Sequence, residues 1–210
     1  MPRSTGRRRA LLALCAICGA AAVVLAFGRA GRDGATTAPA ARAPAPPAVA
    51  PAGPRPPLPD GWRRVRDAAA GFTVGVPPGW SARRSGDALV LRSRDRTLAI
   101  AVGADRSAPG RHASPRAYAE QAIDRLTGYR DLRASAARPL ARAPYPGARA
   151  TATGTYAATG VAQAITLVAL QRRGVGTFTL LAFRSAQAPG APARRIVDRV
   201  VDTLHAERPA

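Results

Sequence analysis

The chain has 210 residues and a formal net charge of +20, because 32 basic residues stand against 12 acidic ones. Every basic residue is arginine, and from residue 61 onwards 24 arginines still face 10 acids, an excess of about +14. Both cysteines, Cys15 and Cys18, lie in one apolar run, which excludes a disulfide from the rest of the chain.

Residues 10–27 form an uncharged apolar run of 18 residues. A run of about this length is just long enough to cross a bilayer as a helix. Arg7, Arg8 and Arg9 stand directly before it, and basic residues beside a span favour the cytoplasmic side. The sequence therefore predicts a cytoplasmic N-terminus over residues 1–9, a single transmembrane helix and an extracytoplasmic remainder held at the cell membrane.

A cleaved signal peptide is the alternative, and it would make the protein secreted. The apolar core of a signal peptide usually ends at a site of the A-x-A kind. Residues 20–22 and 26–28 offer two imperfect sites, but the apolar run continues past the first one. Leu14 and Ile17 precede the two cysteines where a lipoprotein signal needs a small residue, so we interpret the cysteines as apolar fillers.

A proline-rich stretch follows the apolar run. Residues 35–60 contain nine prolines and cannot bury enough apolar surface to fold. We therefore expect residues 28–60 to form a disordered linker that holds the domain away from the membrane. The composition changes at Trp62, which places the folded domain at residues 61–207.

Short alternating runs begin the domain. Residues 72–76 alternate large apolar with small or polar side chains, which is typical of a half-buried strand. Residues 89–91 and 98–102 predict a hairpin that turns at Asp95 and Arg96.

Two segments have helical spacing. Ser114 and Pro115 favour a helix start, and Gly128 is placed where that helix stops. A second helix is predicted over residues 192–205. One of its faces carries the apolar residues Ile196, Val197, Val200, Val201 and Leu204.

Three longer strands are predicted between these helices, over residues 148–156, 161–171 and 177–183. Short turns separate them, so we expect an antiparallel meander. Residues 132–140 have no clear periodicity. The element order predicts an α+β fold in which an antiparallel sheet is flanked by two helices.

The opening of the domain resembles that of PsbP-like domains. In both, a strand led by phenylalanine, here Phe72-Thr73-Val74-Gly75-Val76, runs into Pro77-Pro78-Gly79 and Trp80 after an earlier Gly61-Trp62. The resemblance extends over residues 62–204 and implies a central antiparallel sheet with flanking helices. Exported bacterial members of that family often follow an anchor and a proline-rich linker. No catalytic or ligand-binding residue of the family carries over to this chain.

Histidine is scarce, which restricts catalysis and metal binding. His112 with Asp105 falls short of the three or four ligands of a metal site, and His205 is expected to end the last helix against its dipole. Ser114 is better explained as a helix cap than as a nucleophile, and no G-x-S-x-G motif occurs. We therefore predict no catalytic, cofactor-binding or metal-binding residues and no cofactor.

The charge favours anionic partners, although arginine in place of every lysine is also typical of a GC-rich genome. Specific nucleic-acid binding is not expected, because Phe72, Trp80, Tyr118 and Phe183 fit core positions rather than stacking platforms.

The sequence thus predicts a membrane-tethered, extracytoplasmic, non-catalytic binding module. Its partners would be the membrane through residues 10–27 and an envelope protein or anionic polymer. Two alternatives stay open: an exported hydrolase, and a secreted protein that binds anionic polymer or nucleic acid.

Overall fold

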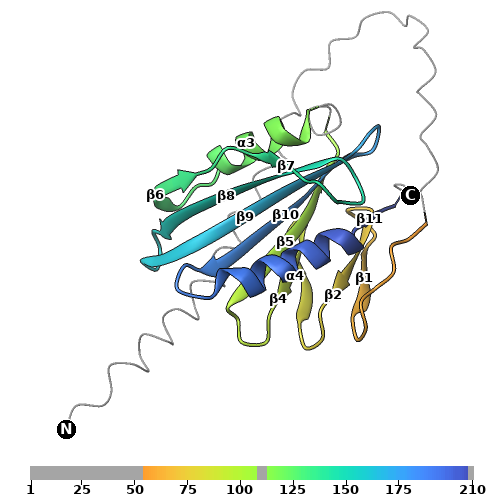
Figure 1. Cartoon of the computed structure of the whole chain (residues 1–210), viewed down its shortest axis with the longest axis horizontal. Coiled ribbons are helices and arrows are strands. Elements are labelled where there is room, and N and C mark those ends of the chain that lie inside the picture. Colours follow the sequence, from red (N-terminus) through yellow and green to blue (C-terminus); the bar gives the residue numbers. More distant parts are fainter. Residues whose placement is uncertain (1–53, 108–112, 208–210) are drawn as a thin grey trace, which may run out of the picture.

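The computed structural model describes residues 54–107 and 113–207, which form eleven strands and two helices (Figure 1). In chain order these elements are β1 Arg63–Asp67, β2 Phe72–Val76, β3 Ser81–Ser85, β4 Ala88–Arg92, β5 Leu98–Asp105, α3 Pro115–Asp124, β6 Tyr129–Ala134, β7 Arg138–Pro139, β8 Gly147–Tyr156, β9 Val161–Arg172, β10 Gly176–Ser185, α4 Gly190–Thr203 and β11 His205–Ala206.

The longest strands, β8, β9 and β10, form an antiparallel meander, as their alternation and short turns predict. β5 pairs with the other edge of β10, and the β4–β5 hairpin forms around the predicted turn. The large sheet therefore has the order β3-β4-β5-β10-β9-β8-β6, and β7 also pairs with β8. β1, β2 and β11 make a separate three-stranded sheet.

The large sheet has apolar side chains on both faces. Successive residues of a strand point to opposite sides, so Phe178 and Leu180 of β10 enter one core while Leu181 and Phe183 enter another. α4 and the small sheet cover the first core, and α4 crosses that face of the large sheet in Figure 1. α3 packs on β8 and β9 at the second core.

The start of α3 follows the predicted capping. Ser114 is the N-cap, its Oγ accepts a hydrogen bond from the Ala117 N–H at 3.2 Å, and Pro115 occupies the first turn. The helix ends at Asp124, before Gly128, which adopts a positive φ of 80° at the entry to β6.

The predicted fold class is wrong. The described residues are mostly β, with eleven strands in antiparallel sheets and two helices, rather than an α+β sheet flanked by helices. The missed strands are β1, β3, β6, β7 and β11. Most of them are short, rich in arginine and largely exposed, because they lie at or near sheet edges and have few apolar positions to alternate.

β2 is buried on both faces, whereas the sequence predicted a half-buried strand. Gly75 explains the difference, since a Cβ there would lie 2.8 Å from Thr203 Oγ1 of α4. The glycine lets α4 approach so closely that the Gly75 N–H donates a hydrogen bond to Thr203 Oγ1 at 2.8 Å. The second face of β2 is therefore covered by the end of α4.

Two further expectations are corrected. α4 ends at Thr203, and His205 lies in β11 opposite Thr73 of β2, so it does not end the helix against its dipole. Trp80 is partly rather than largely buried, because it follows the turn after β2 and lies beside the core. Phe72, Tyr118 and Phe183 are buried as predicted.

The segment before β1 contacts the domain. Arg64 donates a hydrogen bond to the Pro56 carbonyl at 2.6 Å, and Arg55 pairs with Glu207 at 3.3 Å. No helix within the described residues is long and apolar enough to span a membrane. The predicted span over residues 10–27 and most of the predicted linker lie outside the described residues.

Val200→Asp is expected to unfold the domain. Val200 is 0% exposed, and burying such a side chain contributes about 1.5–3 kcal/mol. An unpaired carboxylate in its place costs several kcal/mol more, against a total stability of about 5–15 kcal/mol. Thermal melts followed by circular dichroism should show no native transition, while the neighbouring exposed Arg199→Asp should melt close to the wild type. A wild-type melting temperature for Val200→Asp would contradict the assigned core.

Candidate functional site

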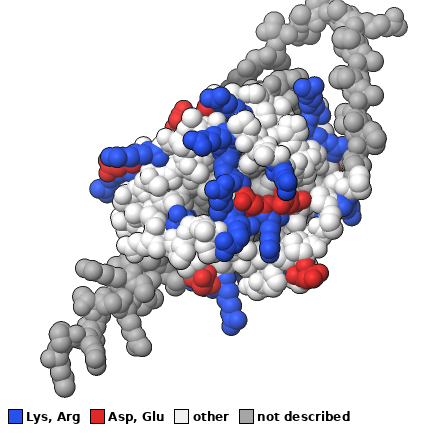
Figure 2. Space-filling view, in the orientation of Figure 1, with Lys and Arg blue, Asp and Glu red and all other residues white. Residues whose placement is uncertain are grey.

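A groove of about 1080 Å³ lies on the face of the large sheet that carries α4. Its floor comes mainly from β8 and β9, one wall from residues 133–142 and the other wall from α4. Figure 2 looks onto this face, where arginine side chains gather around a short acidic strip. Six arginines and two aspartates line the groove: Arg133, Arg138, Arg142, Arg149, Arg184, Arg194, Asp198 and Asp202.

Small and hydroxyl side chains form the floor. On β8, Ala148, Ala150 and Ala152 point toward α3, so Thr151 and Thr153, which alternate with them along the strand, point into the groove. Thr151 lies opposite Thr166 of β9 in the ladder, and Thr153 lies opposite Ala164. Because these side chains are short, this part of the sheet is hollowed between the two walls.

The β6 wall owes its shape to a bulge. The pairing of β6 with β8 shifts register between Arg130 and Arg133, and Asp131 inside the shift has a positive φ of 53°. Gly154 of β8 makes room for it, since a Cβ there would meet the Arg130 carbonyl oxygen at 3.3 Å and Leu132 at 3.1 Å. After the bulge Arg133 lies opposite Thr153 and lines the groove.

Strand β7 and the packing of Tyr145 fix the position of the rest of this wall. Arg138 of β7 lies opposite Arg149 of β8. In the loop that carries Arg142, the Tyr145 ring stacks on Phe178 with centroids 6.5 Å apart. The Tyr145 hydroxyl also accepts a hydrogen bond from the Ala206 N–H at 3.0 Å, which ties this loop to the C-terminal strand.

An ion pair joins the floor to the α4 wall. Arg149, whose side chain is 16% exposed, pairs with Asp198 of α4, and Arg194 lies 3.9 Å from the same carboxylate. The Nε atom of Arg149 is buried without a hydrogen-bond partner among the described residues. Burial and the nearby Asp198 carboxylate raise the pKa of Asp202, although Arg149 partly opposes them.

The arginines of the groove divide into two groups. Arg184 donates hydrogen bonds to the Ser185 carbonyl at 3.0 Å and to the Ala188 carbonyl, so its charge stabilises the turn between β10 and α4. In contrast, Arg133, Arg138 and Arg142 are exposed, and within the described part of the chain their side chains have neither an ion pair nor a hydrogen bond.

The residues that the sequence singled out lie elsewhere. Asp105 accepts hydrogen bonds from the Tyr118 hydroxyl at 3.0 Å and from the Ser107 N–H at 2.9 Å, and His112 lies outside the described residues. His205 is 6% exposed, and burial together with Arg55 and Arg172 lowers its pKa. Across residues 54–107 and 113–207, no three His, Cys, Asp or Glu side chains gather as a metal site would require.

The groove was missed because residues 132–140 show no periodicity. The one usable signal in this region is that Arg133, Arg138 and Arg142 follow one another closely without acids between them. That spacing fits neither a helix face nor a regular strand, because a bulge and a two-residue strand interrupt the segment.

No protein-family model matches this chain, and neither does any curated protein. Solved structures do resemble it. A protein from Bacteroides thetaiotaomicron aligns with a TM-score of 0.51 at 14% identity over 70% of this chain and 49% of that protein, so this chain spans about half of its length. The Ran-binding protein Mog1p from Saccharomyces cerevisiae aligns with a TM-score of 0.50 at 10% identity over 69% of this chain and 95% of Mog1p.

LpqN from Mycobacterium tuberculosis, described as involved in cell envelope biogenesis, aligns less closely. Its TM-score is 0.37 at 13% identity over 73% of this chain and 82% of LpqN. The similarity to Mog1p supports a Mog1/PsbP-like fold, and the opening motif resembles that of PsbP-like domains. At these identities the likeness concerns the fold alone.

Asp202→Asn is expected to raise the melting temperature at neutral pH. The pKa of Asp202 is raised in the folded protein, so its stabilising contribution is full below the unfolded value of about 3.9 and is lost as the pH rises through the folded value. Melts from about pH 3 to about pH 7 should show the gain at neutral pH vanish near the ordinary carboxyl pKa. The exposed Asp87→Asn outside the groove is the control. A gain that persisted at low pH would have another cause.

Proposed function

We propose that this protein is a membrane-tethered, extracytoplasmic, non-catalytic binding module whose groove takes an anionic ligand. The observation that carries the proposal concerns the wall formed by residues 133–142. Its three arginines, Arg133, Arg138 and Arg142, are exposed and form no ion pair with another described residue. Arginines that hold the fold together, such as Arg149 and Arg184, already have carboxylate or carbonyl partners.

The shape of the site strengthens the effect of these charges. Like charges that line a recess in low-dielectric protein focus their potential and raise the local concentration of opposite charge. Arginine also donates two parallel hydrogen bonds to a carboxylate or phosphate. A ligand with several anionic groups would therefore meet three cations whose hydrogen-bond donors are free to turn toward it.

The fold is compatible with a binding role. Mog1p, which shares it, is described as a Ran-binding protein. Because one fold hosts many functions, this supports a protein-binding module in general and names no partner for the chain.

The tether is tested by the mature N-terminus. If residues 10–27 remain as an anchor, protein in the membrane fraction should begin at Met1 or Pro2. Mass spectrometry of the N-terminal peptide and fractionation of the cells check this expectation. A mature chain that begins near Val23 or Arg29 and accumulates in the medium would establish the secreted alternative.

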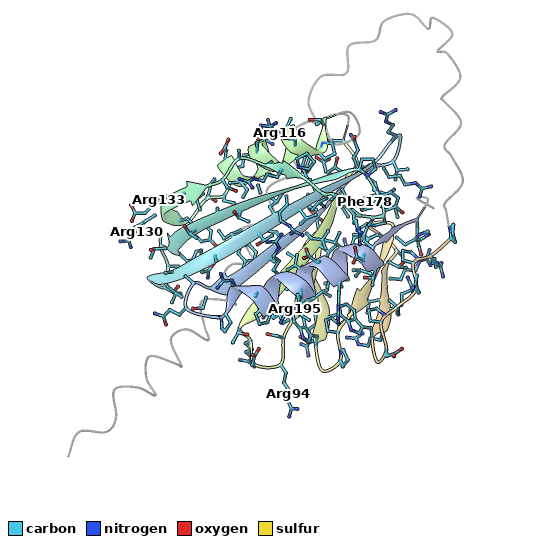
Figure 3. All side chains as sticks on the ribbon, viewed as in Figure 1. Arg94, Arg116, Arg130, Arg133, Phe178 and Arg195 are labelled. Atoms are coloured by element: carbon cyan, nitrogen blue, oxygen red, sulfur yellow. The ribbon has the colours of Figure 1, made fainter. Side chains whose placement is uncertain are left out.

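The groove is tested by two triple variants of equal net charge. Arg133→Gln, Arg138→Gln and Arg142→Gln together should weaken binding to polyglutamate about tenfold, since three exposed ion pairs contribute roughly 0.5 kcal/mol each. The matched control replaces Arg94, Arg173 and Arg195, which are exposed and outside the groove lining. Figure 3 shows Arg94 at the β4–β5 turn and Arg195 on α4.

Fluorescence anisotropy on the full chain in neutral detergent measures both variants at physiological ionic strength, where exposed charges act over about 8 Å. The control triple should stay within about twofold of the wild type, since none of its three arginines lines the groove. Equal weakening by the two triples would show that binding depends on diffuse charge rather than on the groove.

A further inference from the structure

We infer that the ligand of this groove is an acidic protein segment in extended conformation. Its carboxylates would face the wall formed by Arg133, Arg138 and Arg142, and its alternate, uncharged side chains would face α4. The inference rests on the proposed function and adds the chemical class of the partner. Three features carry it: the spacing of the cations, the asymmetry of the walls and the nature of the floor.

The cations are spaced along the groove rather than gathered at one backbone position. Arg133 lies opposite Thr153 and Arg138 lies opposite Arg149, so their backbone positions are four residues apart along β8. At about 3.3 Å per residue this separation is about 13 Å. An extended peptide repeats its side chains on one side every second residue, so acids at alternate positions reach both arginines.

The two walls differ in charge. α4 presents Asp198 and Asp202 to the groove with one cation, Arg194, whereas the lining residues of the opposite wall include three arginines and no acid. A polymer with negative charge on every side would bring anionic groups against these aspartates. A peptide with acids on one side and uncharged side chains on the other avoids that repulsion.

The floor suits a polypeptide backbone better than rings. Thr151, Thr153 and Thr166 offer hydroxyl groups that both donate and accept hydrogen bonds. No aromatic side chain occurs among the described residues that line the groove, so bases find no stacking surface there. The short floor side chains leave depth for a main chain, whose N–H and C=O groups need such partners.

The test compares two peptides of identical composition. In one, glutamate alternates with valine; in its isomer, all glutamates precede all valines. Anisotropy on the full chain in neutral detergent should show the alternating peptide binding about tenfold more tightly, because only it places acids on one side. The Arg133, Arg138 and Arg142 triple glutamine variant should abolish this difference, and the Arg94, Arg173 and Arg195 triple should keep it.

The α4 wall, which carries Asp198 and Asp202, allows a second measurement: the affinity for inorganic polyphosphate, a competing anion. Asp202→Asn should improve polyphosphate binding several-fold relative to the alternating peptide, because it removes repulsion from the α4 wall. Asp87→Asn, on an exposed turn outside the groove, should change neither ligand.

The outcomes separate this inference from the proposed function. Equal affinity for the two isomers, or tighter binding of polyphosphate to the wild type, would overturn the acidic segment. If the groove triple still weakened those ligands selectively, the groove would remain an anion site. If the groove triple and the control triple behaved alike for every anionic probe, the proposed function itself would fail.

Discussion

A single helix packed on a wide sheet is the constraint on which the rest of this structure depends. Seven strands lie side by side in the large sheet, which at about 4.8 Å per strand is roughly 30 Å wide. A helix is about 10 Å across and covers about two strands. α4 and the small sheet cover the region of β4, β5 and β10 together with Val168 and Leu170 of β9, so the part of the same face around Thr151, Thr153 and Thr166 is left open.

The open part of the face has a different composition from the covered part. Ile100, Ala182, Thr166 and Thr151 lie side by side on neighbouring strands, on the face toward α4. The first two belong to the core and are apolar, whereas the last two lie in the groove and carry hydroxyl groups. The opposite face of the same strands keeps apolar residues such as Leu167, because α3 covers it. Whether a side chain is apolar or polar therefore follows from which element lies above it, and the groove is the place where no described element does.

This dependence on long-range packing decides what the sequence could predict. β8, β9, β10 and the β4–β5 hairpin follow from alternation within each segment, and the start of α3 follows from Ser114 and Pro115, so these elements were predicted. β1, β3 and β6 lie at sheet edges with arginines in place of apolar residues, and their strand structure comes from their neighbours. The burial of β2 depends on Thr203 approaching Gly75 from 128 residues away. The groove depends on all of these and could not be predicted from residues 132–140 alone.

The uniform use of arginine raises a different question, because a biased genome and a binding surface both produce a positive chain. The total charge cannot separate the two causes, but the position of each arginine can. Arg84 pairs with Asp67, Arg66 pairs with Glu207 and Arg149 pairs with Asp198, so each of these stabilises the packing of two elements. Single unpaired arginines on convex turns need no explanation beyond composition. Arg133, Arg138 and Arg142 line one wall of a recess with no acid beside them in the lining, whereas the opposite wall carries Asp198 and Asp202 with a single arginine, Arg194. The overall excess of arginine does not account for this uneven distribution of charge between the two walls.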